Sequence, residues 1–580
     1  MKNVYLLLSK SILTFGLVFT AFTGAHAQAP DFEWAKQLSG IGEVISFSIA
    51  TDNSGNVLTS GSFTGTVDFD PGSGNFNLTA SQLDNLFISK IDSLGDFLWA
   101  KQLKFSTSRG NSITTDNNGN IFITGYFHGA RDFDPGTGTF NMTSKSPGTN
   151  PDVFVLKLDS DGDFVWATQI WGNYYNRGND IVTDSYGNAY VSGVSSQGVS
   201  ASSKEDIFIS KIASSGYVSW TKFIGGPNMD QSSSITIDGS GNLYATGIFR
   251  DTVDFNPDNG VFNLHSGNGG IFILKLNSLG NFVWAKMLDN ISHTEPSITS
   301  DAYQNIYITG DFTQTTDFDP GQDTILLSPT TKNAFVLKLN SDGSFMWAKQ
   351  LGKGGTAIGK NVTIGSDGSC LVTGSFTGIA DFDPSESTTF NLNSNGNDDV
   401  FISKLNSNGK FIWAHQFGGT NDDVGRAIIF DGANKLYTTG TFMNTVDFNP
   451  DFSASANLTS VGLQDVFIQK MTLCVPSSSN ISITKCVEYT TPSGNQVLTE
   501  SGIYRDTVLN STGCDSVITI SLNIKKVDVT VSIDSLSLKA NGTNATYQWL
   551  DCNNGFQIIP GETGRTFTGT INNSYAVIVS

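Results

Sequence analysis

Short apolar segments recur along the chain in groups of four, and polar turn residues separate the segments within each group. One group comprises Asn111–Asp116, Asn120–Phe127, Val153–Asp159 and Asp163–Ile170, each of six to eight residues. Segments of this length that are rich in Ile, Val, Phe and Thr predict β-strands. Because the segments are apolar on both faces, we expect each four-stranded sheet to lie between two others.

The turns between the segments combine Asp or Asn with glycine. The first hairpin turn reads DNSGN at Asp52 and DNNGN at Asp116, and the second reads DSLGD at Asp92 and DSDGD at Asp159. Asx residues and glycine supply the positive φ angles that a tight hairpin needs. Each group is therefore expected to fold as antiparallel hairpins.

A tryptophan begins a similar stretch in every group, as in WAKQL at positions 34, 99 and 347. Seven such tryptophans lie 54 to 67 residues apart: Trp34, Trp99, Trp166, Trp220, Trp284, Trp347 and Trp413. A repeat of about sixty residues with four strands per unit is typical of a β-propeller, here with seven blades.

The two ends of this array complement each other. The last unit runs through Asp465–Lys470 and lacks its Trp strand, whereas Asp31–Trp34 matches Asp96–Trp99. Pairing the first strand with the last blade would close the ring and remove both sheet edges. The predicted fold is all-β: a seven-bladed β-propeller closed by the N-terminal strand, followed by small β-sandwich modules.

The stretch GGTNDDVGRAIIFDGANKLYTTGTF, residues 418–442, resembles the β-propeller repeat family (SBBP-like repeats) common in exported bacterial proteins, and all seven units, residues 31–472, fit the pattern. The resemblance implies a propeller fold and little agreed biochemistry. The hairpin DSDGDFVW, Asp159–Trp166, is also similar to the Trp-docking motif of quinoprotein-type propellers, with a turn one residue shorter. This similarity implies that each Trp plugs one blade into the next.

The N-terminal residues have the layout of a secretory signal. Lys2 and Lys10 accompany the apolar run Val4–Phe22, and Ala25-His26-Ala27 precedes Gln28. We expect cleavage after residue 27 and a secreted, extracellular or outer cell-surface location. The alternative of an uncleaved anchor is disfavoured because the apolar run is short and interrupted. The predicted organisation is 1–27 signal peptide, 28–473 propeller, 474–526 cysteine-bracketed β-module and 527–580 Ig-like β-module, incomplete at its end.

The net charge and the hydropathy of the chain restrict the kinds of partner that it can bind. The formal net charge is −20, so a polyanion such as nucleic acid would be repelled. No stretch after the signal could span a bilayer. An extracellular protein or a glycan remains as the expected partner.

The cysteines of the tail predict oxidation in an exported protein. Cys474, Cys486, Cys514 and Cys552 all lie in the last fifth of the chain, and four cysteines allow three pairings. We favour Cys486 with Cys514, which bracket one module, and leave the other two open. Cys370 stands alone in an apolar strand and is expected to be a buried thiol.

Six of the seven units carry DFDP or DFNP between their second and third strands. Strand order puts this connection and the linker to the next unit on one face of the ring, which we call the upper face, and both hairpin turns on the opposite, lower face. Two carboxylates at i and i+2 project to one side, and the intervening Phe projects into the blade. They could hold calcium or cap an Asx turn, and we favour the turn because the motif repeats with the scaffold. The candidate metal ligands are Asp68, Asp70, Asp132, Asp134, Asp254, Asp317, Asp319, Asp381, Asp383 and Asp447. The third unit lacks the motif, which indicates either a docking notch or, as we favour, an eroded repeat.

Four cations are expected at the upper mouth of the central channel. Arg109, Arg177 and Arg426 each lie four residues before an apolar position of the first strand, namely Ile113, Ile181 and Phe430, and Lys360 fills the same place in the sixth unit. In an acidic protein they would focus the field on an anionic group such as a carboxylate. The favoured structural alternative is pairing with an Asp of a neighbouring blade.

A lysine recurs in the third strand of every unit, at positions 90, 157, 211, 275, 338, 404 and 470. Strand order puts it near the first hairpin turn, so we predict ion pairs with turn aspartates such as Asp52 and Asp116. Seven copies of one residue indicate a structural role.

Catalysis is disfavoured by the residues present. The mature chain has His128, His265, His293 and His415 in unrelated contexts, and it has no GxSxG, HExxH or phosphate-binding glycine motif. We expect no enzyme and no cofactor other than possible calcium. The predicted function is recognition or adhesion through the upper face. A structural stalk or coat component is the alternative, and a glycosidase- or quinoprotein-like enzyme is third.

Overall fold

The computed structural model describes most of the chain after residue 29. The described residues are 30–80, 84–104, 110–146, 150–172, 174–196, 205–291, 295–450, 454–473, 477–485, 488–509, 515–524, 530–534, 537–570 and 573–579. Two compact units divide it, one formed by Ala29–Leu473 and the other including Cys474–Ser580. The predicted signal peptide and Arg109 lie outside the described residues.

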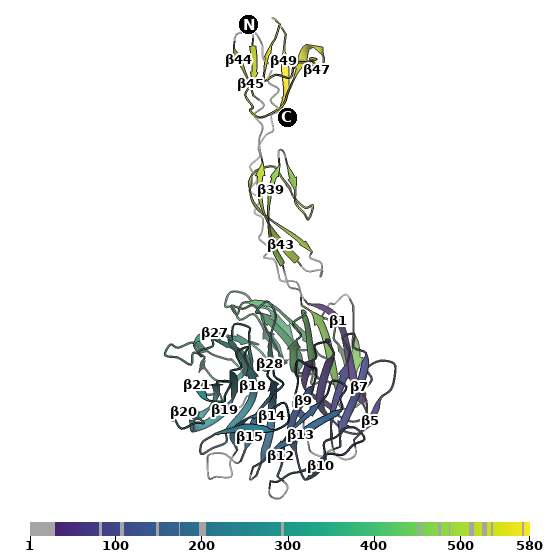
Figure 1. Ribbon diagram of the computed structural model, residues 1–580, viewed down its shortest axis with the longest axis vertical. Coiled ribbons are helices and arrows are strands. Elements are labelled where there is room, and N and C mark those ends of the chain that lie inside the picture. Colours follow the sequence, from purple (N-terminus) through teal and green to yellow (C-terminus); the bar gives the residue numbers. More distant parts are fainter. Residues whose placement is uncertain are drawn as a thin grey trace. The chain divides into compact units, whose positions relative to one another are not determined.

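The described part of the larger unit (Figure 1) contains six four-stranded antiparallel sheets and one six-stranded sheet, whose last two strands are the short β4 (Thr66–Asp68) and β5 (Asn77–Thr79). Each is named here by its order, from sheet 1 to sheet 7. Sheet 1 consists of β2 (Val44–Thr51), β3 (Val57–Phe63), β6 (Asn85–Ile91) and β7 (Phe97–Leu103), and sheet 2 of β8 (Gly110–Thr115), β9 (Ile121–Phe127), β12 (Asp152–Leu158) and β13 (Phe164–Ile170). Sheet 3 consists of β14 (Asn176–Thr183), β15 (Ala189–Ser195), β16 (Asp206–Ile212) and β17 (Val218–Ile224), and sheet 4 of β18 (Gln231–Ile237), β19 (Leu243–Asp254), β20 (Asn263–Leu276) and β21 (Phe282–Asp289).

The remaining three sheets follow the same order of strands. Sheets 5 to 7 consist of β22 (Ser297–Ser300), β23 (Ile306–Phe312), β26 (Asn333–Leu339) and β27 (Phe345–Leu351); β28 (Thr356–Ile364), β29 (Cys370–Thr377), β32 (Asp399–Leu405) and β33 (Phe411–Phe417); and β34 (Val424–Phe430), β35 (Lys435–Phe442), β38 (Asp465–Thr472) and β1 (Asp31–Gly40). The second and third strands of each sheet are almost wholly buried, because each sheet packs between two neighbours.

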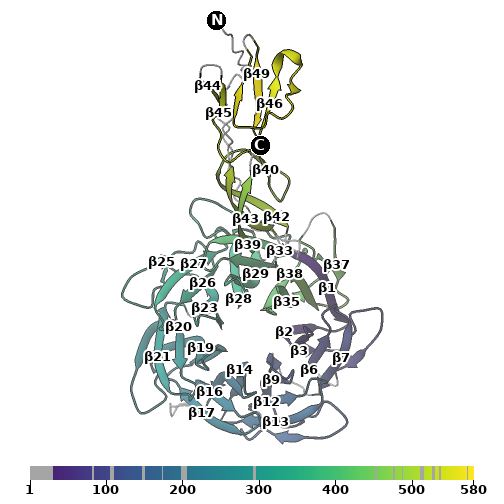
Figure 2. The same cartoon turned by 45° about the horizontal axis from the view of Figure 1, so that its top comes forward.

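The sheets follow one another around a ring, with the first strand of each on the inside (Figure 2). Each first strand contacts the first strand of the next sheet, and β34 of the last sheet contacts β2 of the first. The predicted pairing of the two chain ends is observed, since β1 pairs antiparallel with β38 from Asp31↔Thr472 to Leu38↔Val466. A continuous core of Phe, Ile, Leu and Val lies between successive sheets.

The hairpin turns form as the sequence predicts. The Asp52 carboxylate accepts hydrogen bonds from the backbone N–H groups of Ser54 and Asn56, at 2.9 and 3.0 Å. Gly55 has φ of 76°, and the equivalent Gln304 of sheet 5 has φ of 65°. A non-glycine residue is uncommon in this region, and the Gln304 side chain donates to Ser240 of the neighbouring turn at 2.9 Å.

Six of the seven strand lysines are buried, and Lys211 is partly exposed. Several of them link the first hairpin turn of their own sheet to the next sheet. Lys90 pairs with Asp52 at 2.9 Å and Lys157 with Asp116 at 3.7 Å, which confirms the predicted ion pairs. The ammonium of Lys90 also donates to the Ser160 carbonyl of the next sheet at 2.8 Å. A buried ammonium needs both charge and hydrogen-bond partners.

The repeated tryptophans pack onto the second hairpin turn of the next sheet. A Cβ added to Gly162, where φ is +80°, would lie 2.9 Å from the ring of Trp99. The indole N–H of Trp347 donates to the Ser407 carbonyl at 3.1 Å, and Lys338 donates to the same oxygen at 3.2 Å. Lysine and tryptophan of one sheet therefore meet on one turn of the next, which is the arrangement that we name the turn joint.

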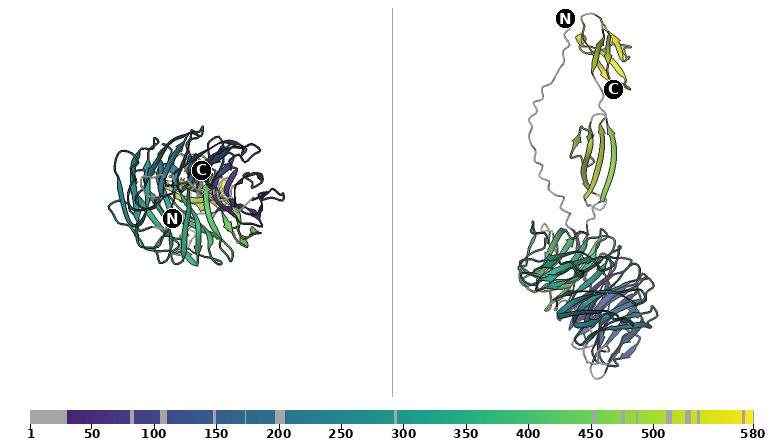
Figure 3. Two further views of the ribbon diagram at one scale, coloured as in Figure 1. Left: turned by 90° about the horizontal axis from the view of Figure 1, so that it is seen from below. Right: turned by 90° about the vertical axis from the view of Figure 1, so that its left-hand side faces the viewer.

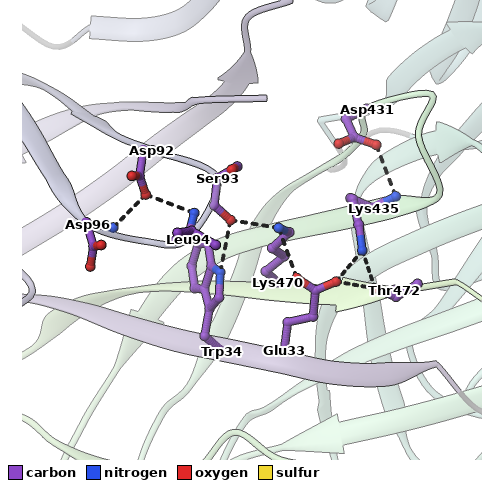
Figure 4. A network of polar contacts seen from close by, with 10 residues as sticks. All are labelled: Glu33, Trp34, Asp92, Ser93, Leu94, Asp96, Asp431, Lys435, Lys470 and Thr472. Atoms are coloured by element: carbon purple, nitrogen blue, oxygen red, sulfur yellow. Dashed lines mark hydrogen bonds and ion pairs between the residues drawn. The ribbon is translucent and has the colours of Figure 1, made fainter. Parts of the chain in front are cut away.

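The turn joint between sheets 7 and 1 is assembled from both ends of the unit (Figure 4). Lys470 of β38 and Trp34 of β1 both donate to the Ser93 carbonyl, at 2.7 and 3.3 Å. These are the same two hydrogen bonds that Trp347 and Lys338 make to the Ser407 carbonyl. At the closing turn joint, however, the lysine and the tryptophan come from strands at opposite ends of the ring-forming sequence.

Glu33 of β1 takes the place of the turn aspartate at this closing turn joint (Figure 4). Its carboxylate pairs with Lys470 at 2.9 Å and also accepts from Lys435 and Thr472. Partial burial opposes ionisation, but hydrogen bonds from Lys435, Thr472 and Lys470 outweigh it and lower the pKa of Glu33 to about 2.

The DFDP segments form short two-stranded ribbons between the second and third strands. They are β4 (Thr66–Asp68) with β5 (Asn77–Thr79), β10 (Ala130–Asp132) with β11 (Asn141–Thr143), β24 (Thr316–Asp317) with β25 (Leu326–Leu327), β30 (Ile379–Asp381) with β31 (Asn391–Asn393) and β36 (Thr445–Asp447) with β37 (Asn457–Thr459), while β19 and β20 continue into the ribbon of sheet 4. The predicted inward Phe is confirmed: Phe69 is fully buried, with ring centroids 5.3 Å from Phe63 and 5.0 Å from Phe87.

The ribbons do not stand on the upper face as predicted, because their tips fold down the outer wall. Asp258, at the tip of the ribbon of sheet 4, accepts from the N–H of Phe282 at 3.0 Å, where β21 begins just after the second hairpin turn. It also pairs with Lys222 of the preceding outer strand at 2.7 Å. Aromatic contacts such as Phe76 with Phe97, at 4.9 Å between centroids, hold the ribbons there. Labels β25 and β37 accordingly lie at the outer rim in Figure 2.

The smaller unit contains two sets of strands, green and yellow in Figure 3. The first comprises β39 (Ser477–Lys485), β43 (Asp515–Ile524) and β42 (Gly502–Leu509), with β40 (Tyr489–Thr490) and β41 (Val497–Leu498); the second comprises β44 (Val531–Asp534), β45 (Ser537–Ala540) and β48 (Thr566–Thr568), and β47 (Gln557–Ile558), β46 (Tyr547–Asp551) and β49 (Tyr575–Val579), with the 3₁₀ turn η1 (Cys552–Asn554). In the second set Trp549 is fully buried beside Phe567.

The cysteines are described only in part. Cys370 is a buried free thiol, as expected, and burial raises its pKa. Cys552 is also free. Cys474, Cys486 and Cys514 lie outside the described residues, so the favoured disulfide stays a prediction.

Candidate functional site

A cavity of about 510 Å³ runs through the ring and is lined by the first strands of all seven described sheets. In six of these strands a β-bulge interrupts the pairing with the second strand, for example between Ser46 and Ser48 and between Gly425 and Ala427. A bulge turns its extra residue out of the ladder. One side chain per sheet is thereby presented at the same height of the cavity wall.

The residue at this bulge position differs from sheet to sheet, although most of the repeat is constant. From sheet 1 to sheet 7 it is Phe47, Asn111, Asn179, Ser233, Pro296, Lys360 and Arg426, with Pro296 placed by its spacing to Ile298. The lysine and tryptophan of the turn joint hardly vary. The cavity wall is therefore the part of the repeat where the side chain differs from sheet to sheet.

The bulges correct the predicted alignment of the cations. Lys360 and Arg426 are bulge residues, whereas Arg177 lies two residues before the bulge of its strand. The apolar position used to align them was therefore not equivalent, since each bulge adds a residue and alternation with period two hides the shift. Arg177, Lys360 and Arg426 do line one cavity, as predicted, but at two heights. Arg109 lies outside the described residues.

In five of the six bulged strands a polar side chain one residue after the bulge makes a hydrogen bond to a neighbouring sheet, whereas Ala427 holds this position in sheet 7. Ser48 accepts from the N–H of Ile113 at 3.2 Å, and Asn361 accepts from the N–H of Ile428 at 3.0 Å. Asp180 accepts from the N–H of Ile235 at 2.9 Å and from the hydroxyl of Ser112 at 2.7 Å. Burial raises the pKa of Asp180 although these bonds favour its charged form.

The cations of the cavity face few acids. Glu295 lines the cavity with them. Glu205, which precedes β16, lies near Arg177; burial raises its pKa and the guanidinium opposes that effect. Among the ion pairs of the described residues, neither Arg177 nor Lys360 has a partner within 4.0 Å. The favoured alternative of pairing with neighbouring aspartates is thus not observed for these two.

The first carboxylate of each DFDP segment caps its own ribbon. Asp68 accepts from the N–H groups of Asp70 and Phe76 at 3.0 and 2.8 Å, and Asp70 accepts from Gly72 at 2.8 Å. The same bonds recur at Asp132, Asp254, Asp317, Asp381 and Asp447. These bonds fit the Asx-turn interpretation. Within the described residues no group of three or more His, Cys, Asp or Glu is placed to hold a metal ion, and calcium binding stays a prediction.

Buried aspartates that the sequence did not reveal hold the linkers between sheets. Asp423 accepts from the N–H groups of Gly419 and Met443 at 2.7 and 2.9 Å, and Asp230 makes the equivalent bonds to Gly226 and Arg250 at 2.8 and 3.1 Å. Burial raises the pKa of each to about 7 despite these bonds. The repeated GG at the start of both linkers was the available signal.

Sequence reasoning also missed a set of aromatic residues at the end of the ring where the outer strands lead into the inner ones. Trp171 and Tyr174 lie in the linker between β13 and β14 and are 45% and 49% exposed. The ammonium of Lys145 lies 5.4 Å from the centroid of the Trp171 ring. The signal was the stretch IWGNYYNRG, since the other linkers lack such a run of aromatic residues.

Two stretches of the chain match the family described as Beta-propeller repeat (SBBP), residues 98–126 and 219–247. Each spans an outer strand, the next inner strand and the strand after it, from β7 to β9 and from β17 to β19. The chain therefore carries SBBP β-propeller repeats at these two places, which confirms the resemblance seen in the sequence, and it is an all-β protein.

Relatives and solved structures give a general likeness. The chain is 22% identical over 472 residues to the "Uncharacterized WD repeat-containing protein L264" of Acanthamoeba polyphaga mimivirus, covering 65% of this chain and 33% of that relative. It thus spans about a third of the relative. BamB from Moraxella catarrhalis has a TM-score of 0.32 and 11% identity over 73% of this chain and 95% of its own. Sqt1 from Chaetomium thermophilum has a TM-score of 0.33 and 9% identity over 77% and 99%. The described residues include no helix long and apolar enough to cross a membrane.

Proposed function

We propose that the protein is an exported, non-catalytic recognition protein in which the seven sheets are the blades of a closed β-propeller and the tail strands form small modules, the second Ig-like. Its partner is an extracellular protein or a glycan that engages the upper end of the propeller. The pairing of β1 with β38 and the contact of β34 with β2 support ring closure. The secretory layout of residues 1–27 supports export.

The observation that carries this proposal is the contrast within each repeat. The turn joint is nearly the same in every sheet, whereas the bulge residue facing the cavity changes from Phe47 to Arg426 around the ring. A rigid scaffold that presents individual side chains at one geometric position is the arrangement of a recognition surface.

A binding screen with the full exported chain tests the proposal. We expect saturable binding of at least one extracellular protein or glycan, weakened about tenfold or more by the pair Lys360→Gln and Arg426→Gln. The matched control is Lys101→Gln, a partly buried lysine of an outer strand that pairs with Asp163 at 3.4 Å and does not line the cavity. Absence of any ligand together with concentration-dependent self-assembly would replace recognition by a structural coat.

Export has a separate test. N-terminal sequencing of the protein recovered outside the cells should begin at Gln28. Recovery of the protein only with membranes and with its first residues intact would overturn this part.

A further inference from the structure

The linker between sheets 2 and 3 presents two aromatic rings in a manner that differs from the other described linkers. Trp171 and Tyr174 are each about half exposed, so one part of each ring packs on the protein and the other faces solvent. Tyr175 adds a third ring, which packs against Tyr126 with centroids 6.4 Å apart. Rings fixed in this way offer large contact surfaces at low entropic cost.

A buried polar network fixes the backbone that carries these rings. Asn176, 1% exposed, donates to the carbonyls of Tyr174 and Pro151, both at 3.2 Å. Asp152, fully buried, accepts from the N–H of Lys145 at 2.6 Å and from Gln169 at 3.0 Å. Because the linker and the segment bearing Lys145 both bond to this network, the backbone that carries the aromatic rings and the lysine is held in one arrangement.

Positive charge gathers at the same end of these sheets in an otherwise acidic protein. Lys145 lies against the Trp171 ring, and Arg177 follows Tyr174 by three residues and lines the cavity. The Arg177 Nε atom is buried and makes no hydrogen bond within the described residues. The net charge of −20 disfavours a polyanion, whereas a few cations at this end of the sheets can still attract a single acidic group.

We propose that the upper end of sheets 2 and 3 is a subsite for a largely neutral glycan carrying one acidic sugar. Sugar rings stack their C–H faces on Trp171 and Tyr174, whose π faces carry partial negative charge, and the sugar carboxylate lies between Lys145 and Arg177. Two separate rings on a polar linker suit flat sugars, whereas the core of a protein interface needs a contiguous apolar patch. This inference rests on the proposed recognition function and names its ligand class.

Glu205 provides a test in which the direction of the change in glycan affinity decides the outcome. Its carboxylate lies near Arg177 and competes with an incoming anion. Removing its charge by the isosteric change Glu205→Gln should strengthen binding of an acidic glycan several-fold, whereas Arg177→Gln, which removes a positive charge, should weaken it. If Glu205 and Arg177 only stabilised the fold, both variants would change the glycan affinity in the same direction.

The experiment measures binding of the full chain to short oligosaccharides that end in one glucuronic or sialic acid, each compared with its methyl ester. We expect the ester to bind about tenfold more weakly, and Trp171→Ala, Tyr174→Ala and Arg177→Gln each to cost about tenfold or more. Tyr186→Ala and Tyr303→Ala are matched controls, since these rings are 84% and 85% exposed on hairpin turns at the other end of the sheets. Unchanged melting temperatures establish that each variant is folded.

Three results would overturn the proposal. Equal affinity for the acid and its methyl ester would show that the site does not recognise the sugar carboxylate. Loss of binding in Tyr186→Ala or Tyr303→Ala, with none in Trp171→Ala, would move the site to the opposite end. Binding of a protein that depends on Lys360 and Arg426 but not on Trp171 would reject the glycan while leaving the recognition function in place.

Discussion

The two ends of the ring differ in how they use the repeat. At the hairpin-turn end, nearly every sheet repeats a lysine with a partner carboxylate and a tryptophan, and even the closing turn joint rebuilds this set from Glu33, Trp34 and Lys470. At the other end, the linkers and the cavity wall carry different residues in each sheet. The comparison teaches that the contacts joining neighbouring sheets are repeated around the ring at one end, whereas the exposed residues at the other end differ from sheet to sheet.

The largest effect should come from the repeated ribbon phenylalanines. Phe69→Ala removes a fully buried ring from between sheets and should destabilise the larger unit by about 3–5 kcal/mol. Thermal unfolding of the full chain measures it, with Phe76→Ala, which is 37% exposed, as the milder control. Equal losses for the two variants would contradict the assignment of Phe69 to the shared core.

Next in size is the buried ion pair of a turn joint. Asp52→Ala leaves the ammonium of Lys90 buried without its carboxylate, at an expected cost of about 2–4 kcal/mol. Adding Lys90→Met should recover part of the loss, because no unpaired charge then remains buried. If the double variant is as unstable as the sum of both single variants, the pair does not act as a unit.

The closing turn joint should respond to acid. The folded pKa of Glu33 is about 2, below its ordinary value of 4.5, so its contribution is present above pH 4.5 and is lost as the pH falls towards 2. Discounted for partial exposure, Glu33→Gln should cost about 1–2 kcal/mol at pH 7 and almost nothing at pH 2. Urea unfolding at the two pH values makes the test, and a pH-independent difference would show that the charge of Glu33 is not responsible.

Smaller effects are expected in the cavity. Lys360→Gln should change the free energy of unfolding by less than about 0.5 kcal/mol, since the side chain has no ion pair within the described residues. A loss as large as that of Asp52→Ala would erase the distinction between the two ends of the ring.

The smallest effect should follow removal of calcium. EDTA should leave the melting temperature unchanged, because Asp68 and Asp70 already accept N–H bonds from their own ribbon. Calorimetry with calcium provides the second measurement. Several saturable sites and a fall of several degrees on chelation would make the ribbon aspartates metal ligands.

The sequence predicted features that depend on local order along the chain. The four-strand units, the Asx turns, the pairing of Asp31–Gly40 with β38 and the Lys90–Asp52 ion pair all follow from spacing and strand order. Features that depend on tertiary packing were missed. The alignment of Arg177 with Arg426 failed at a bulge, and the ribbons were placed on the upper face because their contact with the outer strands, such as Phe76 with Phe97, is not encoded in strand order.

The candidate site was predicted in part. Three of the four cations line the cavity, but the aromatic linker was overlooked because its value lies in the support from Asn176 and Asp152, which are distant in sequence from each other. A polar network of this kind satisfies buried groups only once the strands are placed.

The pairing of β1 with β38 also bears on the order of events during synthesis. The end of β1 pairs with the nearby β4 at Ser39 and Gly40, but Glu33 and Lys435 are 402 residues apart, so the rest of β1 has no strand partner until almost the whole ring has been made. Such a long contact is slow to form, and a waiting strand exposes an unpaired edge to other chains. We therefore expect the pairing of β1 with β38 to form late in folding, and factors that shield residues 31–38 until then should raise the yield of native protein.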